Sequence, residues 1–104
     1  MVHSFPTRRS SDLVLPERTL AWPVATLAEA TLASLAPVID AEPKVELLLL
    51  GCGGRAQSPM SELRRALRAK GIVLELMDTG AACRTYNFLA AEERRVAAAL
   101  IAMR

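Results

Sequence analysis

Residues 72–101 constrain the fold of this chain more than any other stretch. An apolar run, Ile72–Met77, ends in Asp78-Thr79-Gly80, and a second apolar run occupies Val96–Ile101. Between them lies a compact polar cluster, residues 83–87, with the sequence CRTYN. Polar side chains this dense between two buried stretches need partners within the fold or a ligand outside it. The rest of the chain is organised around this stretch, which does not by itself identify a reaction.

A β–α–β unit is predicted over residues 45–77. Val45–Leu50 is a continuous apolar run before a glycine, which is typical of a strand buried on both faces. Ser58 followed by Pro59 predicts a helix start, and Gly71 after a basic turn predicts its end. The first apolar run of the 72–101 stretch supplies the second strand. Such a unit is expected to be right-handed.

The rest of the chain gives weaker signals. Leu20–Val24, with Trp22 before a proline, favours a short edge strand in which the tryptophan packs; a binding role for it is the lesser alternative. A helix is expected somewhere within 31–42. Pattern alone leaves Ala81–Met103 open, as one long helix or as a helix followed by a strand at Val96–Ile101.

The beginning of the chain stands apart from the rest. Residues 3–13 match the translation of a sequencing-library adapter, so we expect 1–13 to be a non-native segment without regular structure. A targeting peptide is the alternative, but the segment lacks the apolar core of a secretory signal. Residues 14–104 are then expected to form a single α/β domain.

Composition excludes several classes of protein. Thirteen basic residues against eleven acidic ones give a charge of +2, too even to argue for nucleic acid or an anionic membrane as partner. No apolar run approaches the roughly 20 residues that span a bilayer. Two cysteines make no disulfide framework and fit a reducing compartment. We therefore expect a cytoplasmic protein, and peripheral association with the inner membrane stays open.

The glycine loop after the first predicted strand is one candidate site. Its residues are Gly51, Cys52, Gly53 and Gly54, whose backbone N–H groups can cradle an anion at the carboxyl end of a strand. Ala56 breaks the dinucleotide fingerprint, and the P-loop pattern is absent. A turn that needs glycine for its own backbone is the favoured interpretation.

The second candidate site follows the next strand. Asp78 and Thr79 are most simply helix caps, while Arg84, Tyr86 and Asn87 either line a pocket or brace the turn. Cys83 and the loop cysteine, Cys52, follow neighbouring strands and could form a redox pair, but two separate buried thiols are the commoner outcome. No metal site and no cofactor are expected.

The run Met77-Asp-Thr-Gly-Ala-Ala-Cys-Arg-Thr-Tyr-Asn87, with Glu93-Arg-Arg-Val-Ala-Ala-Ala-Leu100 behind it, resembles a known signature. It is similar to the family of mitochondrial complex I assembly factor 3 and its uncharacterised prokaryotic homologues. The resemblance implies a three-layer α/β domain around a central mixed sheet, with a final strand near 95–101. It also implies an assembly role without known catalytic residues.

The chain departs from the family in three places. Cys52 stands where the family usually has threonine, and Glu93 stands where it usually has a glycine, at some cost if that turn needs a positive φ. The adapter-like segment replaces the family's first strand, so the edge of the sheet is in doubt.

Three functions follow as hypotheses. The first is a non-enzymatic binding or assembly module whose partner is a respiratory-complex subunit or another assembly factor. The second is a ligand-binding or enzymatic domain that uses the Gly51–Gly54 loop with Asp78, Arg84 and Asn87, and the third is thiol redox chemistry. We expect Arg84, Tyr86 and Asn87 to converge beside the glycine loop, with Phe88 and Leu89 in the core.

Overall fold

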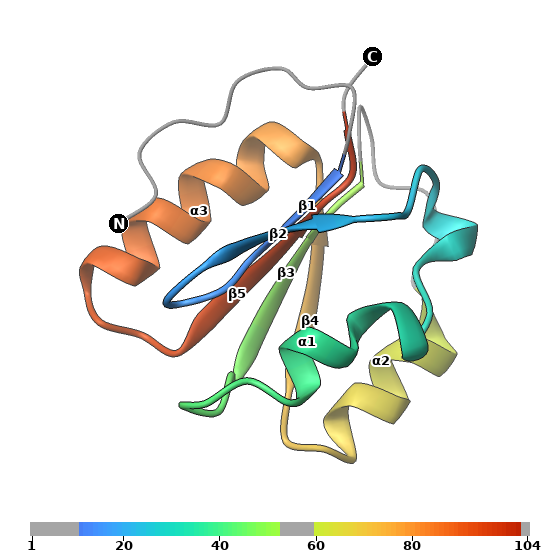
Figure 1. Ribbon diagram of the computed structural model, residues 1–104, viewed down its shortest axis with the longest axis horizontal. Helices are drawn as coiled ribbons and strands as arrows, with labels where there is room; N and C mark the ends of the chain where they lie inside the picture. Colours follow the sequence, from blue (N-terminus) through green and yellow to red (C-terminus); the bar gives the residue numbers. More distant parts are fainter. Residues whose placement is uncertain (1–10, 53–59, 103–104) are drawn as a thin grey trace.

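The computed structural model describes residues 11–52 and 60–102. In chain order its elements are β1 (Ser11–Val14), β2 (Thr19–Trp22), the 3-10 turns η1 (Leu27–Glu29) and η2 (Ala33–Leu35), α1 (Ala36–Ile39), β3 (Leu47–Gly51), α2 (Ser61–Arg68), β4 (Val73–Met77), α3 (Thr79–Ala91) and β5 (Val96–Leu100). The strands form one mixed sheet in the order β2-β1-β5-β3-β4. One face carries α3 and the other carries α1 and α2, so the fold is a three-layer α/β domain (Figure 1).

The β–α–β unit lies where the sequence predicts it. Strands β3 and β4 are parallel, with Leu47 opposite Val73 and Gly51 opposite Met77, and α2 connects them. Strand β3 is buried on both faces, because Leu48 and Leu50 pack into one cluster and Leu49 into the other. Continuous leucines are what a strand covered by helices on both sides requires.

The ends of α2 differ in how well the sequence predicts them. Gly71 has a φ of +81°, which confirms it as the glycine that stops the helix. The start was predicted too early, because the helix begins at Ser61 after Met60, a residue with a left-handed φ of 53°. Ser58 and Pro59 lie outside the described residues. A non-glycine residue with positive φ is uncommon and is not visible as a helix start in the sequence.

The chain after β4 forms a helix and then a strand. Helix α3 ends at Ala91, and Glu93 adopts a φ of 62° in the turn that leads to β5. Strand β5 pairs in parallel with β3 and in antiparallel with β1. The final strand that the resemblance implied is therefore confirmed, as is the positive φ at Glu93.

Two further expectations are confirmed in the segment between β1 and β3. Strand β2 forms the edge of the sheet, and its Trp22 is buried with its indole Nε1 donating to the carbonyl of Ser34 at 3.0 Å. The helix expected within residues 31–42 is present as η2 and the short α1. Among the described residues, no helix has the length and apolar character needed to cross a membrane.

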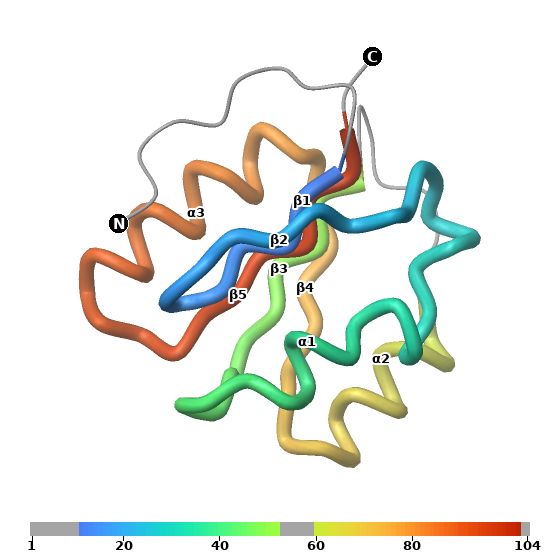
Figure 2. The backbone as a smooth tube through the Cα atoms, viewed as in Figure 1, coloured from blue at the N-terminus to red at the C-terminus, as the bar shows by residue number. Residues whose placement is uncertain are grey.

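The expectation for the N-terminal segment is wrong over Ser11–Leu13. These residues belong to β1, which lies against β5 in the middle of the sheet (Figure 2). Leu13 is only 1% exposed and packs into the cluster beneath α1 and α2, while Val14 packs on the α3 face. The alternation of Leu13 and Val14 between faces suits a strand, and the core stabilises it. Met1–Ser10 lies outside the described residues.

Candidate functional site

The carboxyl ends of β3 and β4 bring the two candidate segments together. The backbone N–H of Cys52 donates to the carbonyl of Met77 at 2.8 Å. A Cβ atom on Gly51 would lie 2.9 Å from the Cα of Thr79 and 3.1 Å from its hydroxyl oxygen. Gly51 is therefore glycine because α3 packs directly against it. Gly53 and Gly54 lie outside the described residues.

Asp78 caps α3, and the predicted cap is confirmed. Its Oδ1 accepts a hydrogen bond from the N–H of Ala81 at 2.7 Å. Thr79 has another role, because its buried hydroxyl donates to the carbonyl of Ile101 at 2.8 Å. This bond fastens the first turn of the helix to the end of β5.

A buried hydroxyl that the sequence interpretation missed lies at the same end of the sheet. Ser11 donates to the carbonyl of Val24 at 2.5 Å and accepts from the N–H of Ala102 at 3.0 Å. It thus joins the beginning of β1 to the chain after β5. Excluding residues 1–13 as non-native removed this residue from consideration, although the neighbouring apolar Leu13 and Val14 are typical of a strand.

Arg84 lies on the exposed side of α3, and its guanidinium reaches back towards the first turn of the helix. Its Nη1 lies 3.4 Å from the position that a Cβ on Gly80 would take, the same distance as Oδ1 of Asp78. The guanidinium and the Asp78 carboxylate therefore both flank Gly80, near the end of the sheet where Gly51 packs.

Tyr86 does not join Arg84. It is 3% exposed, and its hydroxyl donates to the carbonyl of Leu15 at 3.3 Å, beneath the turn between β1 and β2. The side chain of Asn87 is half-buried, and its Oδ1 accepts no hydrogen bond within the part of the chain that the structure describes. The predicted bonds between Asn87 and the glycine loop are therefore not seen there.

The orientation predicted for Phe88 is wrong, whereas that for Leu89 is confirmed. Phe88 is 64% exposed, while Leu89 packs against the cluster on the α3 face. Ala82 and Tyr86, four residues apart, set the buried stripe of the helix, and Leu89 extends it. A residue at position 88 then faces solvent.

The two cysteines lie on opposite faces of the sheet. Cys52 packs into the cluster beneath α1 and α2, and Cys83 packs against the cluster beneath α3. Burial is the main cause that raises the pKa of the Cys52 thiol, and it raises the pKa of Cys83 to about 11. Both thiols are thus protonated at neutral pH, which opposes a redox pair because the thiolate is the reactive form. The residues with described positions hold no cluster of His, Cys, Asp or Glu suited to a metal.

At the opposite end of the sheet, a half-open cavity of about 650 Å³ lies among three turns. Its floor consists of the buried residues Leu15, Tyr86 and Val96. Its wall is built from the β1–β2 turn, the α3–β5 turn and Pro43. The polar lining residues are Glu17, Arg18, Thr19, Glu93, Arg94 and Arg95.

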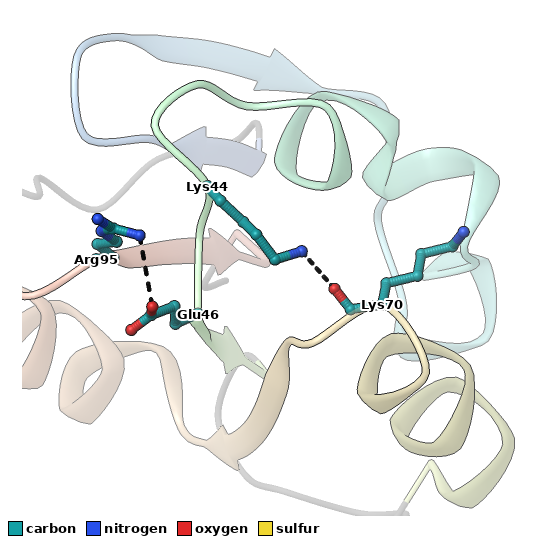
Figure 3. A network of polar contacts seen from close by, with 4 residues as sticks. All are labelled: Lys44, Glu46, Lys70 and Arg95. Atoms are coloured by element: carbon teal, nitrogen blue, oxygen red, sulfur yellow. Dashed lines mark hydrogen bonds and ion pairs between the residues drawn. The ribbon is translucent and has the colours of Figure 1, made fainter.

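Two polar contacts join the segment before β3 to its neighbours beside the cavity. Arg95 forms an exposed ion pair with Glu46 at 3.5 Å, and the ammonium of Lys44 donates to the carbonyl of Lys70 on the other side of the strand (Figure 3). The sequence analysis did not single out Arg18, Arg94 or Arg95 as candidate functional residues. These three residues come from two turns that are distant in sequence, so their proximity becomes visible only when the fold brings the turns together.

Comparisons with known proteins identify the family and relatives of this chain. The family described as "Protein of unknown function (DUF498/DUF598)" matches residues 6–101. NADH dehydrogenase (ubiquinone) 1 alpha subcomplex assembly factor 3 of Danio rerio is 41% identical over 88 residues, which cover 85% of this chain and 51% of that protein. The chain spans about half the length of the curated relatives that it matches first.

Two solved structures share the fold. A crystal structure of a Bordetella parapertussis protein is 39% identical with a TM-score of 0.80, covering 89% of this chain and 79% of that one. The solution structure of a Mth938-like domain from Bordetella pertussis is 35% identical with a TM-score of 0.73, covering 88% and 73%. With the CRTYN signature on α3, these matches show that the chain belongs to the DUF498/DUF598 family, which it shares with the complex I assembly factor 3 proteins.

Proposed function

We propose that this domain is a non-enzymatic binding module that assists the assembly of a respiratory NADH dehydrogenase. The observation that carries the proposal is the 41% identity to an assembly factor, which extends over 85% of the chain rather than over one motif. Its partner would be a subunit of that complex or another assembly factor. We further propose that it acts in the cytoplasm, peripherally at the inner membrane where such a complex is built.

The internal use of the polar residues supports a binding role. The hydroxyls of Thr79 and Ser11 form hydrogen bonds with backbone groups, and Asp78 caps a helix. Groups engaged in this way stabilise the domain and are not poised for proton transfer. A general acid or base needs a pKa tuned to its task and a reacting partner within hydrogen-bond reach.

The test is a quantitative co-purification from a host that contains the complete respiratory chain. We expect the tagged chain to enrich NADH dehydrogenase subunits over a tagged, unrelated domain of similar size and charge. Deleting the gene should lower the amount of assembled enzyme on native gels while leaving subunit transcripts unchanged. Unchanged assembly together with no enrichment would overturn the proposal.

A ligand-binding or enzymatic role at the glycine loop is the competing proposal. The observation in its favour is that the Arg84 guanidinium and the Asp78 carboxylate both flank Gly80, near the end of the sheet where Gly51 packs. A thermal-shift screen with nucleotides and phosphorylated metabolites separates the two proposals. A stabilising ligand whose effect is lost in Gly53→Asp would favour the competing one.

A further inference from the structure

Strand β4 has an open edge. It is the last strand in the sheet order, and it pairs with β3 on one side only (Figure 1). An open edge of this kind can add a strand from another chain, which leads to self-association. The opposite edge strand, β2, has only four residues and is followed directly by Pro23, which limits pairing there. No proline protects β4, which has five residues.

The backbone groups of β4 alternate between the sheet and the open edge. The N–H of Val73 donates to the segment before β3 at 2.9 Å, and the carbonyl of Met77 accepts from the N–H that follows β3 at 2.8 Å. Alternate residues of a parallel strand bond to the same neighbouring strand, so Glu75 between them also bonds to β3. Leu74 and Leu76 therefore direct their backbone N–H and C=O groups outward.

A guanidinium group covers part of this edge. Arg64 projects from α2, and its Nη1 donates to the carbonyl of Leu74 at 2.5 Å. This carbonyl is one of the outward groups that a new strand would need as an acceptor. A hydrogen bond from a charged donor is stronger than the neutral backbone bond that would replace it. An incoming strand must therefore displace Arg64 and lose this bond.

The side chain of Glu75 opposes pairing with a second copy of the strand. Leu74 and Leu76 pack against the cluster beneath α1 and α2, so alternation places Glu75 on the opposite face, where it is exposed. Two copies of β4 related by a two-fold axis pair all five residues only in the antiparallel register centred on Glu75. In that register Leu74 lies opposite Leu76, and the two glutamates lie directly opposite each other. Like charges in such a pair are destabilising.

We propose that Arg64 and Glu75 together hold the β4 edge closed against strand addition by a second copy of this chain. Arg64 occupies a backbone acceptor that the new strand would need. Glu75 makes the register with the greatest overlap repulsive. The inference is independent of the proposed assembly function, because it depends only on the edge of the sheet and on these two side chains.

Sedimentation velocity at micromolar to millimolar concentrations tests the proposal. The edge variant Arg64→Met/Glu75→Gln keeps side chains of similar length but removes both charges. We expect its self-association constant to exceed that of the wild type by about tenfold or more, because an acceptor is freed and a repulsion is removed. The matched control is Arg65→Met/Glu62→Gln, which makes the same change of charge at exposed positions of α2 and should associate like the wild type. Equal association constants in the wild type and the edge variant would overturn the proposal.

A charge exchange tests the register. In the Arg64→Met background, chains that retain Glu75 are mixed with chains that carry Glu75→Lys. Opposite charges then face each other in the mixed dimer, so we expect the mixture to associate more strongly than either chain alone. A mixture that behaves as the average of its two components would contradict the role of Glu75.

Amide hydrogen exchange followed by NMR localises the contact. In the edge variant, the outward amides of Leu74 and Leu76 should exchange more slowly at high protein concentration than at low concentration, because pairing through β4 protects them. The same amides should show no such dependence in the wild type. Self-association that leaves both amides unprotected would place the contact on another surface and refute the proposal. Circular dichroism checks that each variant folds, and Arg64→Ala replaces Arg64→Met if the latter does not.

Discussion

The two ends of the sheet are built differently. At the carboxyl end of β3, Gly51 packs against the backbone of Thr79, and the hydroxyls of Ser11 and Thr79 tie Ile101 and Ala102 to other elements. At the amino end, three turns stand apart around a cavity of about 650 Å³. At the carboxyl end, the polar groups form hydrogen bonds within the fold, whereas at the amino end they are exposed to solvent.

The difference affects where a ligand or partner can bind without a cost in stability. In open α/β sheets, ligands commonly bind beyond the carboxyl ends of the strands. Here the residues described at that end are tightly packed, so changes there should cost stability. Changes at the rim of the cavity should cost little stability. Measurements of unfolding therefore separate the two ends.

The largest effect is expected for Leu13→Ala in β1, the strand that runs between the two ends. Leu13 is almost fully buried, so the variant should lose about 2–5 kcal/mol of unfolding free energy through lost contacts and a cavity. Urea denaturation followed by circular dichroism measures the loss. Asp12→Ala, at the half-buried neighbouring position, is the comparison and should cost less. Equal, small effects would mean that β1 does not belong to the core.

Gly51→Ala should cost about 1–3 kcal/mol, because the new methyl group has no room beside the Thr79 backbone. Gly80→Ala is the control within α3. A Cβ there meets its neighbours at ordinary distances of 3.4 Å, and alanine favours helix by roughly 0.5–1 kcal/mol. The two substitutions should therefore shift the midpoint of unfolding in opposite directions. Unchanged or increased stability in Gly51→Ala would show that the carboxyl end is not tightly packed.

Thr79→Val removes one buried hydroxyl at the closed end and leaves the carbonyl of Ile101 without that donor. We expect a loss of about 1–3 kcal/mol, the typical cost of an unsatisfied buried group. Tyr86→Phe removes the longer bond of 3.3 Å to Leu15 at the cavity floor and should cost less, about 0.5–1.5 kcal/mol. Thermal unfolding of both variants measures which substitution lowers stability more. The reverse ranking would contradict the proposed difference.

Glu93→Gly acts at the rim of the cavity. Glycine relieves the left-handed φ of 62° but increases the freedom of the unfolded chain, so a net gain between zero and about 1 kcal/mol is expected. Glu92→Gly is the control, because Glu92 has an ordinary φ of −94° and should lose stability. Differential scanning calorimetry compares the two, and a loss of stability in Glu93→Gly would show that its side chain supports the turn.

At neutral pH the smallest effect is that of Cys83, because it appears only in alkaline solution. Burial raises the pKa of its thiol in the fold to about 11 from an ordinary value of 9.0. The unfolded chain therefore loses this proton first, and stability should fall as the pH rises between these values. The fold should also slow the reaction of Cys83 with a disulfide reagent at pH 8 relative to its reaction in urea. Comparison with Cys83→Ser isolates this contribution, and equal rates in both conditions would refute it.

The sequence predicts the central β–α–β unit because its signals are local. The leucines of β3 and Gly71 after α2 reflect burial and a backbone conformation that few other residues allow. The final strand could not be deduced from its pattern alone, since Ala97–Ala99 favour helix by propensity. These alanines are fully buried between the layers, and packing overrides propensity. Only the family resemblance indicated this strand.

The candidate site was only partly predictable because helix length separates its members. Asp78 and Tyr86 are eight residues apart, which places them about 12 Å apart along the axis of α3. Tyr86 therefore reaches the cavity, while Arg84 folds back towards Gly80. The cavity itself depends on turns that are distant in sequence, such as those carrying Arg18 and Arg94, and only the folded sheet brings them together.

The position of β5 has a consequence for biosynthesis. It is the last of the five strands to be translated, yet it lies between β1 and β3. Until Leu100 has left the ribosome, the β1–β2 hairpin and the β3–α2–β4 unit share no strand, and each leaves an open edge towards the missing one. The growing chain then carries two unjoined pieces until β5 is available. Completion of the domain thus waits for β5 and depends on contacts distant in sequence, and protection of the two unjoined pieces should raise its yield.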